Sequence, residues 1–243
     1  MRSMLYRVRL VCVVVAVAGC LPLCTQLASG STITNLNVGQ SIALSSVLET
    51  GGEAIQIGDK LFDNFQFSYT DTDSDPSDDL SASDVTINAL QDSFGYGLSL
   101  EMPLSTHHDV TKDVVIKFSV LVLDPSQQIS GVELGMQAST TGDGLADVSE
   151  SVYTGGFGAG SIANLDVSSP GSLSTSVQFT SPQSEIWVEK DILVYAGCGC
   201  ENSAAIQTVE QNFSQVPEPS TWMLVGLGLL GVLECHCIRR RVR

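Results

Sequence analysis

The stretch of sequence that decides the fold is KDVVIKFSVLVLDP, residues 112–125. Its alternate residues are apolar: Val114, Ile116, Phe118, Val120 and Val122. Successive side chains of a β-strand point to opposite faces of the sheet, so this period of two places all five on one face. Leu121 and Leu123 add apolar side chains to the other face, and Pro125 ends the pattern. The stretch therefore predicts the most buried strand of the molecule.

Shorter patterns of the same kind lie on both sides of this strand. Residues 60–70 (KLFDNFQFSYT), 83–91 (SDVTINALQ) and 96–104 (YGLSLEMPL) each contain apolar residues at a period of two. Further runs follow at roughly ten-residue spacing, separated by turn residues, and no amphipathic helix interrupts them. About ten to twelve short strands predict an all-β fold, an antiparallel β-sandwich or jelly-roll-like domain over residues 31–215.

The charge of the chain is distributed unevenly. The formal net charge is −16, yet seven of the eleven basic residues lie in the first ten and the last five positions. Between residues 31 and 216, four lysines face twenty-five aspartates and glutamates. Such an acidic surface repels phosphate backbones, which argues against nucleic-acid binding. The abundance of Gly, Ser and Thr is typical of an extracellular β domain.

The N-terminal segment, residues 1–30, predicts a secretory signal peptide. Three arginines precede an apolar stretch, LVCVVVAVAGCLPL, that is short for a membrane span. Ala28 and Gly30 fit the small-residue preference of a signal peptidase and place the mature start at Ser31. An alternative remains open, because residues 17–20 (VAGC) resemble a bacterial lipobox, whose cysteine is acylated before cleavage.

Four cysteines remain after the predicted cleavage at Ser31. Cys198 and Cys200 lie in AGCGCE, and Cys235 and Cys237 lie in ECHC. A disulfide within Cys-x-Cys closes a strained ring, so Cys198 and Cys200 are expected to pair elsewhere, stay reduced or bind a soft metal. The spacing within ECHC does not match a zinc site.

An acidic run, DTDSDPSDD at residues 71–79, is the main candidate for a calcium site. Alternate aspartates can direct hard oxygen ligands at one calcium ion, here from Asp71, Asp73, Asp75, Asp78 and Asp79. The run departs from an EF-hand, because Pro76 replaces the turn glycine and Ala82 replaces the bidentate glutamate. Two interpretations stay open, a loose Ca²⁺ site and a solvated acidic loop, and no other cofactor is expected.

No catalytic constellation is predicted. His107 and His108, beside Asp109, are the only histidines before the C-terminal segment, and no G-x-S-x-G motif accompanies them. The glycine-rich residues 155–160 (GGFGAG) fail the G-x-G-x-x-G spacing and predict a loop. We therefore expect that the chain is not an enzyme.

The C-terminal segment, residues 216–243, has three parts. Pro217, Glu218 and Pro219 predict a rigid break, because proline lacks a backbone donor and restricts the residue before it. Eighteen residues, 221–238, span about 27 Å as a helix and predict a membrane anchor. Its anchoring residues are Trp222, Leu224, Leu227, Leu229, Leu230 and Leu233. The basic cluster Arg239, Arg240, Arg241 and Arg243 is expected on the cytoplasmic side.

This tripartite segment resembles the PEP-CTERM sorting signal, the C-terminal anchor of exported bacterial proteins that an exosortase processes. The resemblance rests on Pro217–Pro219, the apolar run STWMLVGLGLLGVL and the arginine cluster; the residues ECHC depart from it. It implies export, transient anchoring in the inner membrane with the β domain outside, and cleavage near the PEP turn. Signal peptidase and an exosortase are the partners implied, and exopolysaccharide is a further candidate.

Three functions agree with these features. The first is a non-enzymatic surface protein of the extracellular matrix, a biofilm or adhesion. The second is a secreted carbohydrate-binding module or a polysaccharide-acting enzyme. Trp187, the only tryptophan before residue 216, lies between Ile186 and Val188 and can face either side of its strand. The third is a calcium-dependent adhesin, which depends on the acidic run.

Overall fold

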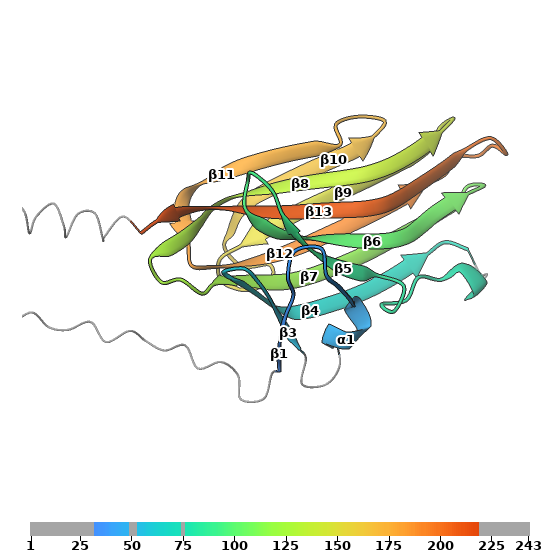
Figure 1. Cartoon of the computed structure of the whole chain (residues 1–243). Helices are drawn as coiled ribbons and strands as arrows, with labels where there is room; N and C mark the ends of the chain where they lie inside the picture. Colours follow the sequence, from blue (N-terminus) through green and yellow to red (C-terminus); the bar gives the residue numbers. More distant parts are fainter. Residues whose placement is uncertain (1–31, 49–52, 74–75, 219–243) are drawn as a thin grey trace, which may run out of the picture.

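Two β-sheets pack face to face in the computed structural model, which describes residues 32–48, 53–73 and 76–218 (Figure 1). The prediction of an all-β antiparallel sandwich is confirmed. These ranges contain thirteen strands, slightly more than predicted. The predicted signal peptide and the predicted C-terminal helix lie outside them.

The first sheet has seven strands and contains the strand predicted within residues 112–125. In spatial order its strands are β1 (Ile33–Asn35), β3 (Ala54–Ile57), β4 (Lys60–Asp71), β7 (Thr111–Val122), β12 (Glu185–Tyr195), β9 (Leu145–Tyr153) and β10 (Ser161–Ser169). All neighbours pair antiparallel except β1 and β3, which are parallel. The strand β7 lies at the centre of this sheet, in agreement with its predicted burial.

The second sheet has six strands. In spatial order they are β11 (Ser174–Gln183), β8 (Gln127–Thr141), β13 (Ser203–Pro217), β6 (Tyr96–His107), β5 (Thr86–Gln91) and β2 (Ser41–Ala43). A short helix, α1 (Leu44–Leu48), follows β2 and buries Leu44 and Val47, and a 3-10 turn, η1, covers Pro76–Asp78. The helix α1 was not predicted, because five residues are too few to show a helical period.

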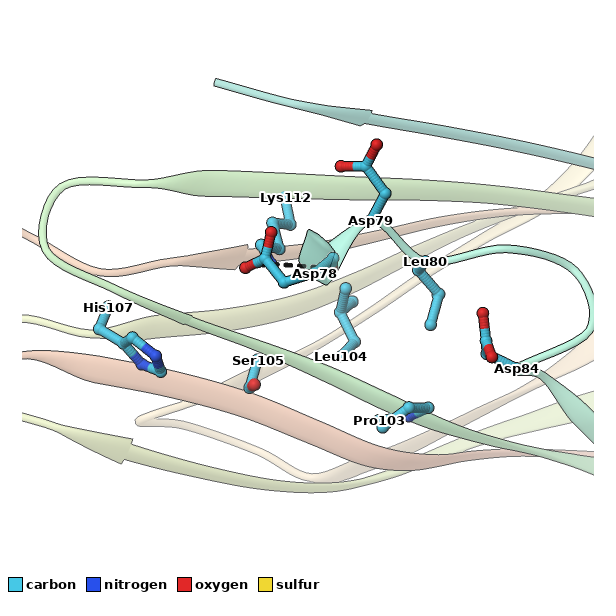
Figure 2. Close-up of a pocket in the computed structure, with 9 residues that line it drawn as sticks. All are labelled: Asp78, Asp79, Leu80, Asp84, Pro103, Leu104, Ser105, His107 and Lys112. Atoms are coloured by element: carbon cyan, nitrogen blue, oxygen red, sulfur yellow. Dashed lines mark hydrogen bonds and ion pairs between the residues drawn. The ribbon is translucent and has the colours of Figure 1, made fainter. Parts of the chain in front are cut away.

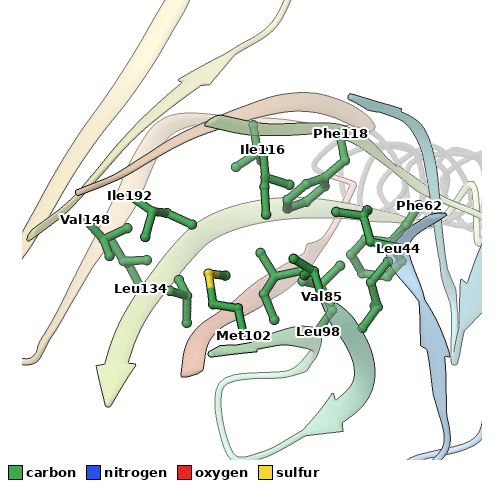
Figure 3. Close-up of a cluster of buried hydrophobic side chains, with 14 of the residues drawn as sticks. Leu44, Phe62, Val85, Leu98, Met102, Ile116, Phe118, Leu134, Val148 and Ile192 are labelled. Carbon is green, nitrogen blue, oxygen red and sulfur yellow. The ribbon is translucent and has the colours of Figure 1, made fainter. Parts of the chain in front are cut away.

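The core lies between the two sheets and is built from the inward face of each strand. The five alternating side chains of β7 are all buried, and Phe118 packs against Phe62 and Phe65 of β4. Figure 3 shows Ile116 and Phe118 facing Met102 and Leu98 of the second sheet. Burial of these apolar faces is the main source of stability in such a sandwich.

The strand β4 contains a bulge, at the point where its aromatic residues shift from even to odd positions in the sequence. Phe62 points inward from an even position, and Phe65 is buried from an odd one. The pairing with β7 shifts between Asp63 and Gln66, and Asn64 in the bulge has a φ of 58°. The extra residue returns the aromatic side chains to the core side of the strand.

Candidate functional site

The acidic run lies in the connection that follows β4. Carboxylate oxygens of Asp71, Asp73 and Asp78 lie within 4.8 Å of one another. Asp79 is exposed, and its pKa is raised by desolvation, by a hydrogen bond with Asp71 and by the neighbouring carboxylates. Asp75 lies outside the described residues. The structure thus brings three of the five predicted ligands together, with one more beside them.

A lysine from β7 already neutralises part of this cluster. Lys112 is 4% exposed, and its ammonium donates to the carboxylate of Asp78 and, at 3.2 Å, to the Asp78 carbonyl oxygen. A cavity of about 350 Å³ lies beside this ion pair, and His107 and Leu104 of β6 are among its lining residues. Figure 2 shows the ion pair together with these residues. A cation that used all three carboxylates would compete with Lys112 for Asp78.

Calcium binding at this cluster stays a prediction, and it can be tested by thermal unfolding. Because extracellular calcium modules bind at about 0.1–1 mM, about 10 mM Ca²⁺ is expected to stabilise the domain by at least ~1 kcal/mol relative to EDTA. Asp71→Asn should abolish the difference, whereas Asp59→Asn, which lies in another turn, should keep it. Equal melting temperatures in Ca²⁺ and EDTA would contradict the prediction.

The histidine pair lies where β6 ends and the tight turn to β7 begins: His107 is the last residue of β6, and His108 is in the turn. His108 and Asp109 both adopt left-handed φ angles, 57° and 63°, which the turn requires. The carboxylate of Asp109 accepts a hydrogen bond from the Tyr195 hydroxyl at 3.3 Å. Asp109 also raises the pKa of the Cys198 thiol by hydrogen bonding and by its negative charge, which lowers the thiolate fraction. The geometry of the turn supports the structural interpretation of the pair.

Both cysteines of the described chain, Cys198 and Cys200, are exposed and free, in the turn after β12. In this structure they are therefore in the reduced form, one of the three alternatives that the sequence left open.

An aromatic cluster covers part of the outer face of the first sheet. Ile186 and Val188 are buried, so Trp187 between them faces outward, in register with Tyr153 of β9. Phe157, from the predicted glycine-rich loop between β9 and β10, packs edge-on against Trp187 with 4.9 Å between ring centroids. The two orientations that the sequence left open for Trp187 are thus resolved.

Charged side chains complete this outer-face cluster. The Lys117 ammonium lies 5.7 Å from the centre of the Phe157 ring and 3.0 Å from a carboxylate oxygen of Glu189. Lys117 and Glu189 are 27% and 29% exposed. The cluster therefore offers apolar ring surface beside groups that can exchange hydrogen bonds with a polar ligand.

A row of aspartates crosses the same outer face towards the other end of the strands. Asp113 of β7 and Asp191 of β12 share a hydrogen bond, and so do Asp147 of β9 and Asp166 of β10. Desolvation, together with the bond to Asp191 and its charge, raises the pKa of Asp113 to about 6. A carboxylate pair of this kind favours one shared proton over two charges.

The Asp113–Asp191 pair predicts a loss of stability between pH 4 and pH 7. In the unfolded chain the pKa of Asp113 is about 3.9, so the folded state holds its proton more tightly. The stabilising contribution is full below pH ~4 and is lost as the pH rises through ~6. Asp113→Asn should remove this dependence and raise stability at pH 7 by about 1 kcal/mol, after allowance for solvent screening.

Urea unfolding of both proteins at pH 4.5 and pH 7 provides the measurement. Asp124→Asn is the control, and its effect on stability at pH 7 should have the opposite sign, a loss. The reason is that hydrogen bonds from Ser126 lower the pKa of Asp124. If Asp113→Asn loses stability with pH as steeply as the wild type, the pair does not share a proton.

The predicted sorting motif begins at the end of β13. Pro217 is paired with Gln127 of β8, so the strand continues two residues beyond the predicted domain boundary at residue 215. Proline is tolerated there because it is the last residue of the strand. The Glu218 backbone N–H donates to the Ser126 carbonyl at 2.9 Å, and its carboxylate accepts from the Gln128 amide at 3.5 Å.

The remaining predicted sorting and anchor residues, Pro219 to Arg243, lie outside the described residues. Among the residues that the structure does describe, no helix has the length and apolarity needed to cross a membrane.

Comparison with known proteins identifies the C-terminal segment. Residues 215–241 match the model of the PEP-CTERM protein-sorting motif, so the chain carries this motif, as the sequence predicted. No curated protein matches the chain.

Solved structures with partial similarity include carbohydrate-binding modules. TmCBM61 in complex with β-1,4-galactotriose has 11% identity and a TM-score of 0.29, over 63% of this chain and 88% of that chain. CsCBM6-3 from Clostridium stercorarium in complex with cellobiose has 11% identity and a TM-score of 0.25, over 74% and 97%. At such scores no function is transferred from them.

Proposed function

We propose that this chain is an exported, non-enzymatic surface protein whose β-sandwich is released from its membrane anchor by an exosortase. The observation that carries the proposal is the PEP-CTERM motif over residues 215–241. All thirteen described strands precede Pro219 in the chain, so cleavage near the motif leaves the complete sandwich on the released product. The proposed route starts with removal of the signal peptide, proceeds through an inner-membrane anchor with the sandwich outside, and ends at the cell surface or in the medium.

The acidic charge of the sandwich agrees with this route. All seven arginines of the chain lie at its two ends, whereas the sandwich carries four lysines against twenty-five acidic residues. Arginines after the apolar run favour a cytoplasmic C-terminus, which places the sandwich on the outer side. Outside the cell the negative charge keeps copies of the domain apart and soluble.

The proposed role of the released sandwich is binding within the extracellular matrix or adhesion to it, through the outer-face cluster. Trp187, Phe157 and Tyr153 present ring surface next to Lys117 and Glu189. Sugar rings pack their C–H faces on aromatic side chains and exchange hydrogen bonds with charged neighbours. An exopolysaccharide is therefore the ligand class that this surface fits, which unites the matrix role with the carbohydrate-binding alternative.

The route is tested by fractionation of the full chain in a host with and without its exosortase, followed by the mass of the C-terminus. With the exosortase, we expect a product that has lost the anchor; without it, the intact chain should stay in the membrane fraction. Glu218→Ala should block processing, whereas Gln128→Ala removes the hydrogen-bond partner of Glu218 and leaves the motif intact. An intact C-terminus in both hosts would refute the sorting role.

The binding role is tested with purified protein and isolated exopolysaccharide in a pull-down. Trp187→Ala should abolish retention, whereas Tyr195→Ala, at the far end of the same strand and face, should leave it unchanged. Equal retention of wild type and Trp187→Ala would refute glycan binding at this cluster.

A further inference from the structure

Three polar side chains meet in the middle of the apolar core. Lys190 of β12 and Glu150 of β9 belong to the first sheet, and Gln211 of β13 belongs to the second. Their exposed fractions are 0%, 1% and 0%. The Lys190 ammonium donates to Glu150 Oε2 and to Gln211 Oε1, so one lysine bridges the two sheets.

The surroundings of this triad are apolar on every neighbouring strand. Lys190 is in register with Ile116 of β7, and Glu150 is in register with Leu165 of β10. Gln211 lies between Leu134 of β8 and Leu98 of β6. Figure 3 shows Ile116, Leu134 and Leu98 as members of one buried cluster. The three polar groups are therefore held together in a medium that excludes water.

Two polar atoms of the triad have no hydrogen-bond partner within the described part of the chain. They are Glu150 Oε1 and Gln211 Nε2. A buried carboxylate oxygen and a buried amide nitrogen without partners are costly in a static core. The same two atoms are a proton acceptor and a leaving group, which gives the arrangement a chemical interpretation.

We propose that Lys190 and Gln211 form an intramolecular isopeptide bond, with Glu150 as the proton acceptor, and that this bond joins the two sheets covalently. Lys190 Nζ first transfers a proton to Glu150 and becomes a neutral amine. Its electron pair then attacks Gln211 Cδ, so the Nζ–Cδ bond forms and the Cδ–Nε2 bond breaks. A second proton from Nζ moves to Nε2, which leaves as ammonia.

The reaction balances within the triad and needs no other reactant. The ammonium, the carboxylate and the primary amide become a secondary amide, a neutral carboxylic acid and ammonia, and nothing is oxidised or reduced. Both buried charges disappear, which removes the electrostatic cost of keeping them out of water.

The core prepares the three groups for this step. Desolvation lowers the pKa of Lys190 more strongly than the charge and hydrogen bond of Glu150 raise it, which favours the nucleophilic amine. The amine is held against the carboxamide by the fold, and fixed neighbours of this kind react as if at very high concentration. Glu150 lies opposite Lys190 in the strand pairing, within reach of the proton.

Peptide mapping of the purified full chain tests the proposal. A glutamate-specific protease cuts after Glu189, Glu201, Glu210 and Glu218, which isolates residues 190–201 with Lys190 and residues 211–218 with Gln211. The expected result is one joined species whose mass is about 17 Da below the sum of the two peptides, the mass of ammonia. Two separate peptides at their sequence masses would overturn the proposal.

Further samples assign the roles within the triad. Lys60 is the matched control, because it is also 0% exposed and paired with an aspartate, Asp59, and its peptide should carry no link. Glu150→Gln keeps the size of the side chain and should give two separate peptides, with folding checked by circular dichroism. A joined species in Glu150→Gln, or a Lys190 peptide joined to Glu150 with loss of about 18 Da, would overturn the proposed chemistry. The wild-type map alone decides the existence of the bond if a variant does not fold.

Discussion

Replacing Glu150 by alanine is expected to lower the free energy of unfolding by about 3–5 kcal/mol, because it leaves the buried Lys190 without a counter-charge. Lys190 cannot reach solvent from the middle of the sandwich, so it must either remain charged among Val and Leu side chains or release its proton. Loss of the proposed isopeptide bond between Lys190 and Gln211 would also lower the free energy of unfolding. Urea unfolding followed by circular dichroism measures the change.

A second ion pair on the same strand supplies the control. Glu189 is the neighbour of Lys190 in sequence, but it faces outward and pairs with Lys117 at 3.0 Å, with 29% of its side chain exposed. Glu189→Ala should cost at most about 1 kcal/mol, because water and salt screen an exposed pair. Comparable losses in the two variants would show that burial does not control the strength of the Glu150 pair.

The sequence predicted these strands correctly but did not reveal what their polar residues do together. In EIWVEKDILVY, Ile186, Val188 and Ile192 mark the inward phase, and Lys190 falls in that phase. That polar residue at an inward position was the signal available for Lys190. Its partners could not be predicted, because they are 40 and 21 residues away and the pairing of strands is not encoded in any single pattern.

The assignment of each strand to one of the two sheets could not be predicted from the sequence either. The pattern of residues 33–44, ITNLNVGQSIAL, is typical of two short strands around a turn, and both strands, β1 and β2, are present. They do not form a hairpin, because β1 pairs with β3 and β2 pairs with β5 in the opposite sheet. A turn fixes the reversal of the chain, whereas the partner of each strand depends on which apolar faces can be buried together.

The candidate sites show the same limit. The clustering of Asp71, Asp73 and Asp78 follows from their closeness in sequence, but the neutralising Lys112 comes from a strand 34 residues beyond Asp78. Trp187 could face either way until its neighbours on β12 were placed in the core. Spacing in the sequence therefore predicted which groups lie near each other, whereas the packing of the two sheets determines which of them face solvent.

Phe118→Ala is expected to have an effect as large as Glu150→Ala, through packing instead of charge. Phe118 lies at the centre of the stretch 112–125 and is 0% exposed. Its ring is stacked on Phe65, with 5.6 Å between centroids, and is tilted against Phe62 at 6.1 Å. Removal of a buried aromatic side chain costs about 3–5 kcal/mol, because apolar burial is lost and a cavity remains.

Leu123→Ala, just beyond the end of β7, is the matched control for Phe118→Ala. Leu123 belongs to the same apolar stretch, but its side chain is 42% exposed. Its replacement should change the free energy of unfolding by no more than about 0.5 kcal/mol. If the two variants unfold at the same urea concentration, the alternation that predicts this fold does not identify the side chains that stabilise it. A large loss in Phe118→Ala alone would show that the inward phase of β7 holds the two sheets together.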